Sequence, residues 1–211
     1  LEVAHEALEQ ARIPQGLRNG ANIGSFAAQC SADFALINKV SIAPAGAYKQ
    51  SGLAASICAN RISHTFGLKG PSMTIDTACS SSLVAIDSAC KAVYNHDCEM
   101  AVVVGVQLNL TMDNFIGFSA AGMLSRQGRC ATFSDQADGY TRGEGCGAVV
   151  MKPLLRALED GDAMWGVLHG SAINQDGRTA TLTAPNGPAQ EQVVRTAIAR
   201  AGIRPDDVGY V

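Results

Sequence analysis

A single cysteine stands where the chain changes from the spacing of a strand to the spacing of a helix, and this junction constrains the fold more than any other feature. In residues 72–77 the side chains alternate around Met73 and Ile75, which predicts a β-strand. From Ser80 to Tyr94 the apolar residues recur at helical spacing, which predicts a helix. The predicted apolar stripe of this helix consists of Leu83, Ile86, Cys90 and Val93. Cys79 lies between these two elements.

The rest of the chain alternates strand-like and helix-like segments, which predicts a layered α/β fold. Buried strands are predicted in residues 100–110 and 145–152, a further strand in 164–173, and a weaker one in 22–26. Helices are predicted in residues 1–12, 31–39, 52–64 and 154–158, and from Pro188 to a capping glycine at Gly202. Residues 174–177 predict a turn, and the acidic turn at 159–162 predicts a boundary between two lobes.

Composition excludes several classes of protein. Hydrophobic residues make up 47% and charged residues 17%, which suits a globular core rather than disorder. The net charge is −3 without a basic run, so a nucleic-acid partner is not expected. No apolar stretch reaches the roughly 18 residues of a membrane span. The chain starts without Met and directly in a predicted helix, so we expect an internal segment without a signal peptide.

The seven cysteines do not form a pattern typical of disulfides or zinc. Their number is odd and the sequence has no Cys-x-x-Cys, so neither a disulfide framework nor a metal site is expected. Reduced cysteines are the default of a cytoplasmic protein, and we expect this location.

The position of Cys79 suits a nucleophile. The N-terminus of a helix carries partial positive charge and unpaired N–H groups, which favour a thiolate over a thiol. A sharp strand-to-helix turn also lifts the side chain out of the backbone, and its N–H groups stabilise an oxyanion. Ser80 to Ser82 supply small hydroxyl side chains that can cap the helix. The alternative is a buried, inert cysteine at a helix start, and physical reasoning alone leaves both interpretations open.

The run from Asp76 to Leu83, DTACSSSL, resembles the active-site signature of β-ketoacyl synthases, in the form found in type I polyketide synthases and animal-type fatty acid synthase. Further blocks resemble that family in its own order: 59–63, 122–125, 138–140, 142–147, 170–177 and 182–188. The resemblance implies the thiolase-like fold, layered αβαβα. Of this fold the chain would hold an incomplete part, the first half in residues 1–160 and the beginning of the second half in 161–211.

The resemblance also implies an acyltransferase that performs a decarboxylative Claisen condensation. Cys79 would accept the acyl chain, which then condenses with a malonyl-type extender. Phe118 would line the acyl pocket, with core packing as its alternative, and Ala78 would contact the substrate beside Cys79. No cofactor would bind directly, because substrates arrive on the phosphopantetheine of acyl carrier protein. The implied partners are acyl carrier protein, acyltransferase domains and a second copy in a homodimer.

The histidines of the chain receive no catalytic role. In the family, two catalytic histidines and a lysine would follow Val211, so the isolated fragment is expected to be inactive. Structural roles are therefore expected for His5, His64, His96 and His169, and Cys146 is expected to be inert. Gly143, Gly145 and Gly147 fit either a close backbone approach or a turn into a strand. Residues 22–33 depart from the family, which leaves a first-lobe edge strand in question.

Two other functions remain open at this point. One is a thiolase that acts on coenzyme A esters, which shares the fold and the cysteine. The other is a non-elongating ketosynthase that holds or transfers chains because it has lost a histidine. The Ser80–Ser82 run and the block at 174–177 favour the condensing synthase over the thiolase.

Overall fold

A computed structural model describes residues 1–40 and 46–211, without the side chains of residues 38–40. The chain forms two compact units, Leu1–Met151 and Lys152–Val211. The predicted acidic turn at 159–162 lies in the second unit. No helix among the described residues is long and apolar enough to cross a membrane.

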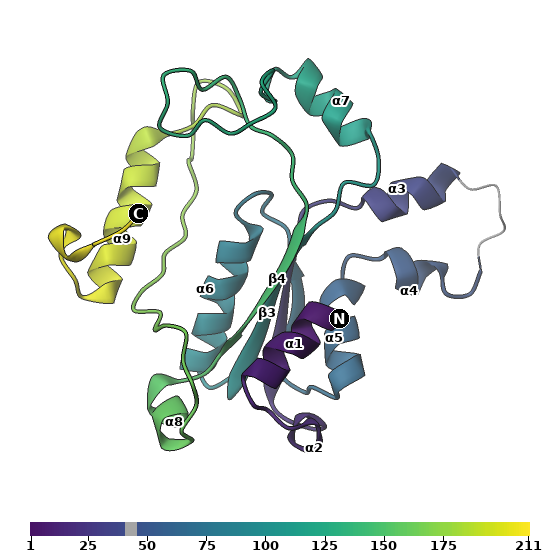
Figure 1. Ribbon diagram of the computed structural model, residues 1–211, viewed down its shortest axis with the longest axis vertical. Coiled ribbons are helices and arrows are strands. Elements are labelled where there is room, and N and C mark those ends of the chain that lie inside the picture. Colours follow the sequence, from purple (N-terminus) through teal and green to yellow (C-terminus); the bar gives the residue numbers. More distant parts are fainter. Residues whose placement is uncertain (41–45) are drawn as a thin grey trace. The chain divides into compact units, whose positions relative to one another are not determined.

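A four-stranded sheet organises the first unit (Figure 1). Its strands lie in the order β2 (Ser72–Ile75), β1 (Ile23–Gln29), β3 (Met100–Gln107) and β4 (Gly145–Met151). β1 pairs in parallel with β2 and β3, while β4 runs antiparallel to β3. The C-terminal ends of the three parallel strands therefore meet at the edge where β4 begins, and Gln107 pairs directly with Gly145 there.

β1 lies inside the sheet rather than at its edge. Residues Ile23 to Ala28 are buried, and both neighbouring strands bond to β1. The strand that the sequence left in question is therefore present, as an inner strand of the sheet. The chain before β2 packs closely against β1, because a Cβ on Gly70 would lie 2.5 Å from the carbonyl carbon of Ile23.

Helices cover both faces of the sheet. α1 (Glu2–Gln10) and α5 (Ile57–Phe66) pack on one face, where Leu8 and Ile62 join Val102 and Val104 in one core cluster. α6 (Ser81–Tyr94) packs on the other face, and Val103 belongs to the core cluster on that side. Consecutive residues of β3 thus point to opposite cores, which confirms a strand buried on both faces.

The buried side of α6 matches the predicted stripe only in part, since Ile86 and Val93 pack against the core cluster. Ala85, Ala89 and Ala92 are buried, whereas Leu83 is 70% exposed. Small residues allow the helix to approach the sheet closely: a Cβ on Gly105 of β3 would lie 2.5 Å from Ser82 Oγ. Small residues therefore face the sheet alongside the larger apolar ones.

Several predicted segments differ from the structure in their bounds or their burial. The helix predicted at 52–64 is two helices, α4 (Lys49–Leu53) and α5. The strand predicted to Leu110 ends at Gln107. β4 is less buried than predicted, since it is an edge strand and Val149 is 47% exposed.

A buried arginine joins α1 to the short α2 (Gln15–Arg18). Arg18 is 1% exposed, and its Nε donates a hydrogen bond of 2.8 Å to the carbonyl of Ile13. A terminal nitrogen of its guanidinium lies 2.5 Å from Glu9 Oε1. The guanidinium also lies over the ring of Phe66, on which His5 stacks, so His5 has a packing role.

The second unit contains α8 (Leu154–Glu159), α9 (Gly187–Ala201) and a 3₁₀ turn at Pro205–Asp207. Asn186 caps α9 by accepting a hydrogen bond from the Ala189 N–H, and Gly202 ends the helix with φ +67° as predicted. Before α8, Lys152 lies 2.6 Å from Asp160 and 2.5 Å from Asp162. Burial disfavours the charge of Lys152, but these two carboxylates outweigh that cost and raise its pKa.

The strand predicted in residues 164–173 is absent from the described structure of the second unit. A strand needs a neighbour for its main-chain hydrogen bonds, and no strand is described in this unit to pair with it. An apolar pattern in the sequence is therefore not sufficient for a strand to form.

Candidate active site

Cys79 lies in a turn between β2 and α6, as the sequence predicts. β2 ends at Ile75 and α6 begins at Ser81, so Cys79 is two residues before the first helical residue. The residue is exposed and its thiol is free. The buried-cysteine alternative therefore does not describe this position.

The residue before Cys79 has an unusual backbone. Ala78 has φ +57°, the left-handed region that residues with a Cβ rarely adopt. The carboxylate of Asp76 accepts a hydrogen bond from the Ala78 N–H at 3.0 Å, which stabilises this conformation. The chain thereby reverses direction within a few residues and leaves Cys79 at the surface.

Two serine hydroxyls tie the turn to the helix. Ser81 Oγ accepts a hydrogen bond from the Thr77 N–H at 2.8 Å and donates one to the Ala78 carbonyl at 2.6 Å. Ser80 Oγ donates to the Thr77 carbonyl at 2.8 Å. Ser80 is the N-cap residue, but its side chain caps no helical N–H. The expected capping role is thus wrong for Ser80, whose hydroxyl instead bonds to the turn.

Phe118 lies on α7 (Asp113–Ala120), which follows β3. Its ring is half-buried and lies 6.4 Å from the ring of Tyr140. The guanidinium of Arg142 covers Phe118 at 5.2 Å and donates a hydrogen bond of 3.1 Å to Asn109. Phe118 and Cys79 have different immediate neighbours, but both follow strands that end at the same edge of the sheet.

Sequence reasoning missed Asp33, the first residue of α3 (Asp33–Val40). Its side chain is buried and accepts three hydrogen bonds. The donors are the Leu110 N–H at 3.0 Å, the Thr111 N–H at 3.3 Å and the Asn114 amide at 2.9 Å. Its partners lie 77 to 81 residues away, so no local pattern would have identified it.

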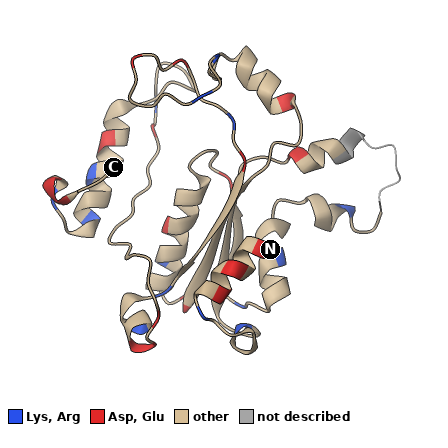
Figure 2. Ribbon diagram, viewed as in Figure 1, with Lys and Arg blue, Asp and Glu red and all other residues tan. Residues whose placement is uncertain are grey.

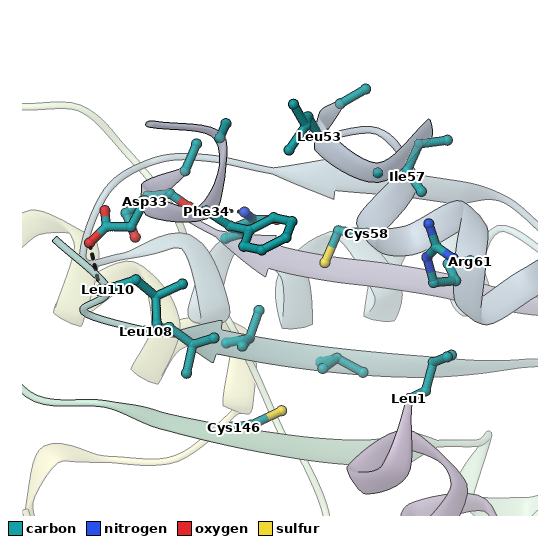
Figure 3. Close-up of a pocket in the computed structure, with 18 of the residues that line it drawn as sticks. Leu1, Asp33, Phe34, Leu53, Ile57, Cys58, Arg61, Leu108, Leu110 and Cys146 are labelled. Atoms are coloured by element: carbon teal, nitrogen blue, oxygen red, sulfur yellow. Dashed lines mark hydrogen bonds between the residues drawn. The ribbon is translucent and has the colours of Figure 1, made fainter. Parts of the chain in front are cut away.

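A pocket of about 340 Å³ opens beside the ends of β1 and β3 (Figure 3). Apolar side chains such as Ile57 and Leu108 line it, together with the thiols of Cys58 and Cys146. Burial raises the pKa of Cys58. The lining includes neither Cys79 nor Phe118, so we do not identify this pocket with the proposed nucleophile site.

The glycines at the start of β4 do not need to be glycine for close packing. A Cβ on Gly143, Gly145 or Gly147 would meet no atom within 4 Å in the described structure. The interpretation as a turn into a strand is therefore favoured. Cys146, between two of these residues, is exposed.

The described residues include no group of three or more His, Cys, Asp or Glu side chains arranged to hold a metal ion. The ribbon in Figure 2 marks acidic and basic residues on most elements, with acidic ones on α1.

The chain matches two family models in succession. "Beta-ketoacyl synthase, N-terminal domain" matches residues 1–157, and "Beta-ketoacyl synthase, C-terminal domain" matches residues 165–211. Among curated proteins, the chain is 46% identical to one of the phenolphthiocerol/phthiocerol polyketide synthase proteins of Mycobacterium tuberculosis. It is 45% identical to polyketide synthase ThaG of Burkholderia thailandensis. Both matches cover the whole chain, which spans 11% and 4% of the two relatives.

Solved structures give the same result. The ketosynthase from module 6 of the bacillaene synthase of Bacillus subtilis 168 matches 98% of the chain with a TM-score of 0.89 and 36% identity. An oxazolomycin ketosynthase domain of Streptomyces albus JA3453 matches 99% with a TM-score of 0.88 and 32% identity. The chain spans 35% and 38% of these two structures.

Proposed function

Because the chain belongs to the β-ketoacyl synthase family, we propose that it is the part of a polyketide synthase ketosynthase that carries the nucleophile, Cys79. The complete domain would catalyse a decarboxylative Claisen condensation. One observation carries the assignment: the thiol of Cys79 is exposed directly before α6, in a turn with left-handed backbone at Ala78.

The thiolase-like α/β class predicted from the sequence is confirmed, because the similar solved structures are ketosynthases. We further propose that residues 1–160 form the first half of the layered fold and residues 161–211 begin the second. The division into two compact units and the succession of two family models support a boundary in this region.

The first chemical step is a transfer of the acyl chain. The thiolate of Cys79 attacks the carbonyl carbon of a thioester carried by phosphopantetheine. A bond from sulfur to carbon forms, negative charge develops on the carbonyl oxygen, and the phosphopantetheine thiolate leaves and takes up a proton. N–H groups at the start of a helix suit that oxyanion because they are fixed in place before the reaction.

The second step extends the chain. A malonyl-type extender loses carbon dioxide, and its carbanion attacks the acyl group on Cys79, which releases the thiolate. Covalent storage on sulfur separates acyl transfer from carbon–carbon bond formation. The family resemblance assigns the groups that assist decarboxylation, two histidines and a lysine, to positions that follow the matched blocks.

Substrates and partners follow from this proposal. Acyl carrier protein would deliver both the acyl chain and the extender on phosphopantetheine, and an acyltransferase domain would load the extender. Ala78 and Phe118 would contact the acyl chain; the half-buried, tilted ring of Phe118 at the edge of the sheet supports this role. We also propose a homodimer. A cytoplasmic location is supported by seven cysteines that are all free.

The test is acylation of the full-length synthase with an acyl group on acyl carrier protein, followed by peptide mass spectrometry. We expect the acyl group on the peptide that contains Cys79, and no acylation of Cys79→Ala. Cys130→Ala, which removes another exposed thiol, is the matched control and should acylate normally. Acylation at another residue, or efficient acylation only from coenzyme A esters, would contradict the proposal and favour the thiolase interpretation.

A further inference from the structure

A buried carboxylate controls the start of α7, the helix that carries Phe118. Asp33 is 3% exposed and accepts hydrogen bonds from the main-chain N–H groups of Leu110 and Thr111. Figure 3 shows its carboxylate beside Leu110, at the edge of the pocket. These contacts fix the connection between β3 and α7 to the start of α3.

The same carboxylate also contacts α7 directly. The amide of Asn114 donates a hydrogen bond of 2.9 Å to Asp33 Oδ1. Asn114 and Phe118 are four residues apart, so they lie on the same side of α7 one turn from each other. Asp33 therefore sets both the position of the helix and the rotation that places Phe118.

Packing contributes little to the position of α7. None of its residues, all of which the structure describes, is buried. At its far end Phe118 contacts Tyr140 and Arg142. A helix without a buried face depends on such specific contacts, and buried Asp33 supplies one to α7 itself and two to the residues just before it.

We propose that Asp33 is a positioning residue that determines how well long acyl chains bind, because it fixes Phe118 through α7. This inference rests on the proposed function of Phe118 as part of the acyl site. Asp33 itself touches no reacting atom. Its loss should weaken the binding of chains long enough to reach Phe118 and leave the reactivity of the Cys79 thiol unchanged.

The test compares variants of the full-length synthase in single acylation reactions with acetyl- and octanoyl-pantetheine thioesters. For Asp33→Ala we expect the KM for the octanoyl probe to rise about tenfold, because α7 no longer holds Phe118 in one position. A tenfold change corresponds to the net free energy of roughly one buried hydrogen bond. The KM for the acetyl probe should change much less. Alkylation of Cys79 by iodoacetamide should keep the parent rate, because this small reagent does not need Phe118.

Two variants separate positioning from a general structural defect. Asp33→Asn retains an oxygen for the two main-chain N–H groups, and its amide can pair with a flipped Asn114 side chain, so it should restore most of the octanoyl binding. Asp97→Ala removes an exposed carboxylate before β3 and should behave like the parent. If Asp33→Ala does not fold, Asn114→Ala decides, because it removes only the contact to α7 and should shift the octanoyl KM in the same direction.

The inference is wrong if the octanoyl and acetyl KM values shift equally, or if neither shifts in Asp33→Ala or, where that variant fails to fold, in Asn114→Ala. Failure of the proposed function looks different: the parent synthase itself would then accept no acyl group on Cys79 from either probe.

Discussion

Ser81 accepts a hydrogen bond from the backbone N–H of Thr77, and this contact spans Cys79. The first helical residue of α6 is thereby tied to the residue two positions before the thiol. Ser81 is buried, and its hydroxyl also donates to the carbonyl of Ala78. A single side chain thus closes the turn that presents Cys79.

Replacing Ser81 by alanine should slow acylation without unfolding the protein. The change removes two hydrogen bonds worth about 1 kcal/mol each, so the turn samples other conformations and the acylation rate should fall about tenfold. The measurement is the rate at which the full-length synthase accepts an acetyl thioester. Ser88→Ala, further along the same helix, is the control; an equal loss in both variants would show that the contact to Thr77 has no special role.

The left-handed backbone at Ala78 predicts opposite effects for two substitutions. Glycine should be tolerated or stabilising by up to about 1 kcal/mol, because it adopts positive φ without the Cβ penalty. Valine should destabilise the turn by about 1–2 kcal/mol, since β-branched residues are least compatible with this region. Urea denaturation and the acylation rate together check this order, and equal behaviour of Ala78→Gly and Ala78→Val would contradict it.

The cysteines should differ in their reaction with iodoacetamide as pH changes. Burial raises the pKa of both Cys58 and Cys98. The thiolate is the reactive form, so a raised pKa leaves less of it at a given pH. Labelling of these two residues should therefore begin at higher pH in the folded protein than after unfolding in urea. Mass spectrometry of each peptide from pH 6 to about 10 tests this, near and above the usual thiol pKa; the same onset of Cys58 labelling in folded and unfolded protein would contradict it.

Arg18→Met should destabilise the first unit by about 2–3 kcal/mol, because a charge-assisted bond to Glu9 is lost and the Ile13 carbonyl is left unpaired. The urea concentration at which buried Cys98 becomes reactive measures this loss. Lys69→Met removes an exposed positive charge instead and should change stability by no more than about 0.5 kcal/mol. Similar shifts in both variants would mean that Arg18 contributes only surface charge.

Two glycines next to the sheet should respond differently to alanine. A Cβ on Gly70 would overlap backbone atoms of Ile23 and Gly24, which cannot move away, so Gly70→Ala should cost about 2–3 kcal/mol. A Cβ on Gly105 would meet the hydroxyl of Ser82, which can rotate, so Gly105→Ala should be milder. The same urea assay compares them, and a larger loss for Gly105→Ala would overturn the steric argument.

The sequence predicted those features that are set by nearby residues. Three features depend on residues only a few positions apart: the junction at Cys79, the start of α9 next to Pro188 and the glycine at its end. The buried side of α6 was predicted only in part, because Ile86 and Val93 pack against the core but Ala residues are its most buried ones and Leu83 is exposed. That choice depends on Gly105, in another element. The strand predicted at 164–173 failed for a related reason, since strand formation needs a partner.

In the candidate site, too, features set by nearby residues were predicted and features set by distant residues were not. The resemblance proposed Cys79 and Phe118 as site residues from short motifs, and the structure adds how each side chain is held in place. Asp33 was invisible because an aspartate at a helix start is ordinary, and only the folded chain brings it to Leu110 and Asn114. Contacts between residues distant in sequence are the part that local patterns do not predict.

The direct pairing of Gln107 with Gly145 has a consequence for engineering. The segment between them, residues 108–144, leaves the sheet and returns to it at one paired position. Its two ends are therefore held together by the sheet. This segment could be exchanged for the corresponding segment of a relative, together with the residue at position 33 that bonds to it. The sheet and its two cores would remain unchanged. Because Phe118 is proposed to contact the acyl chain, we expect such an exchange to change which acyl chain length is preferred.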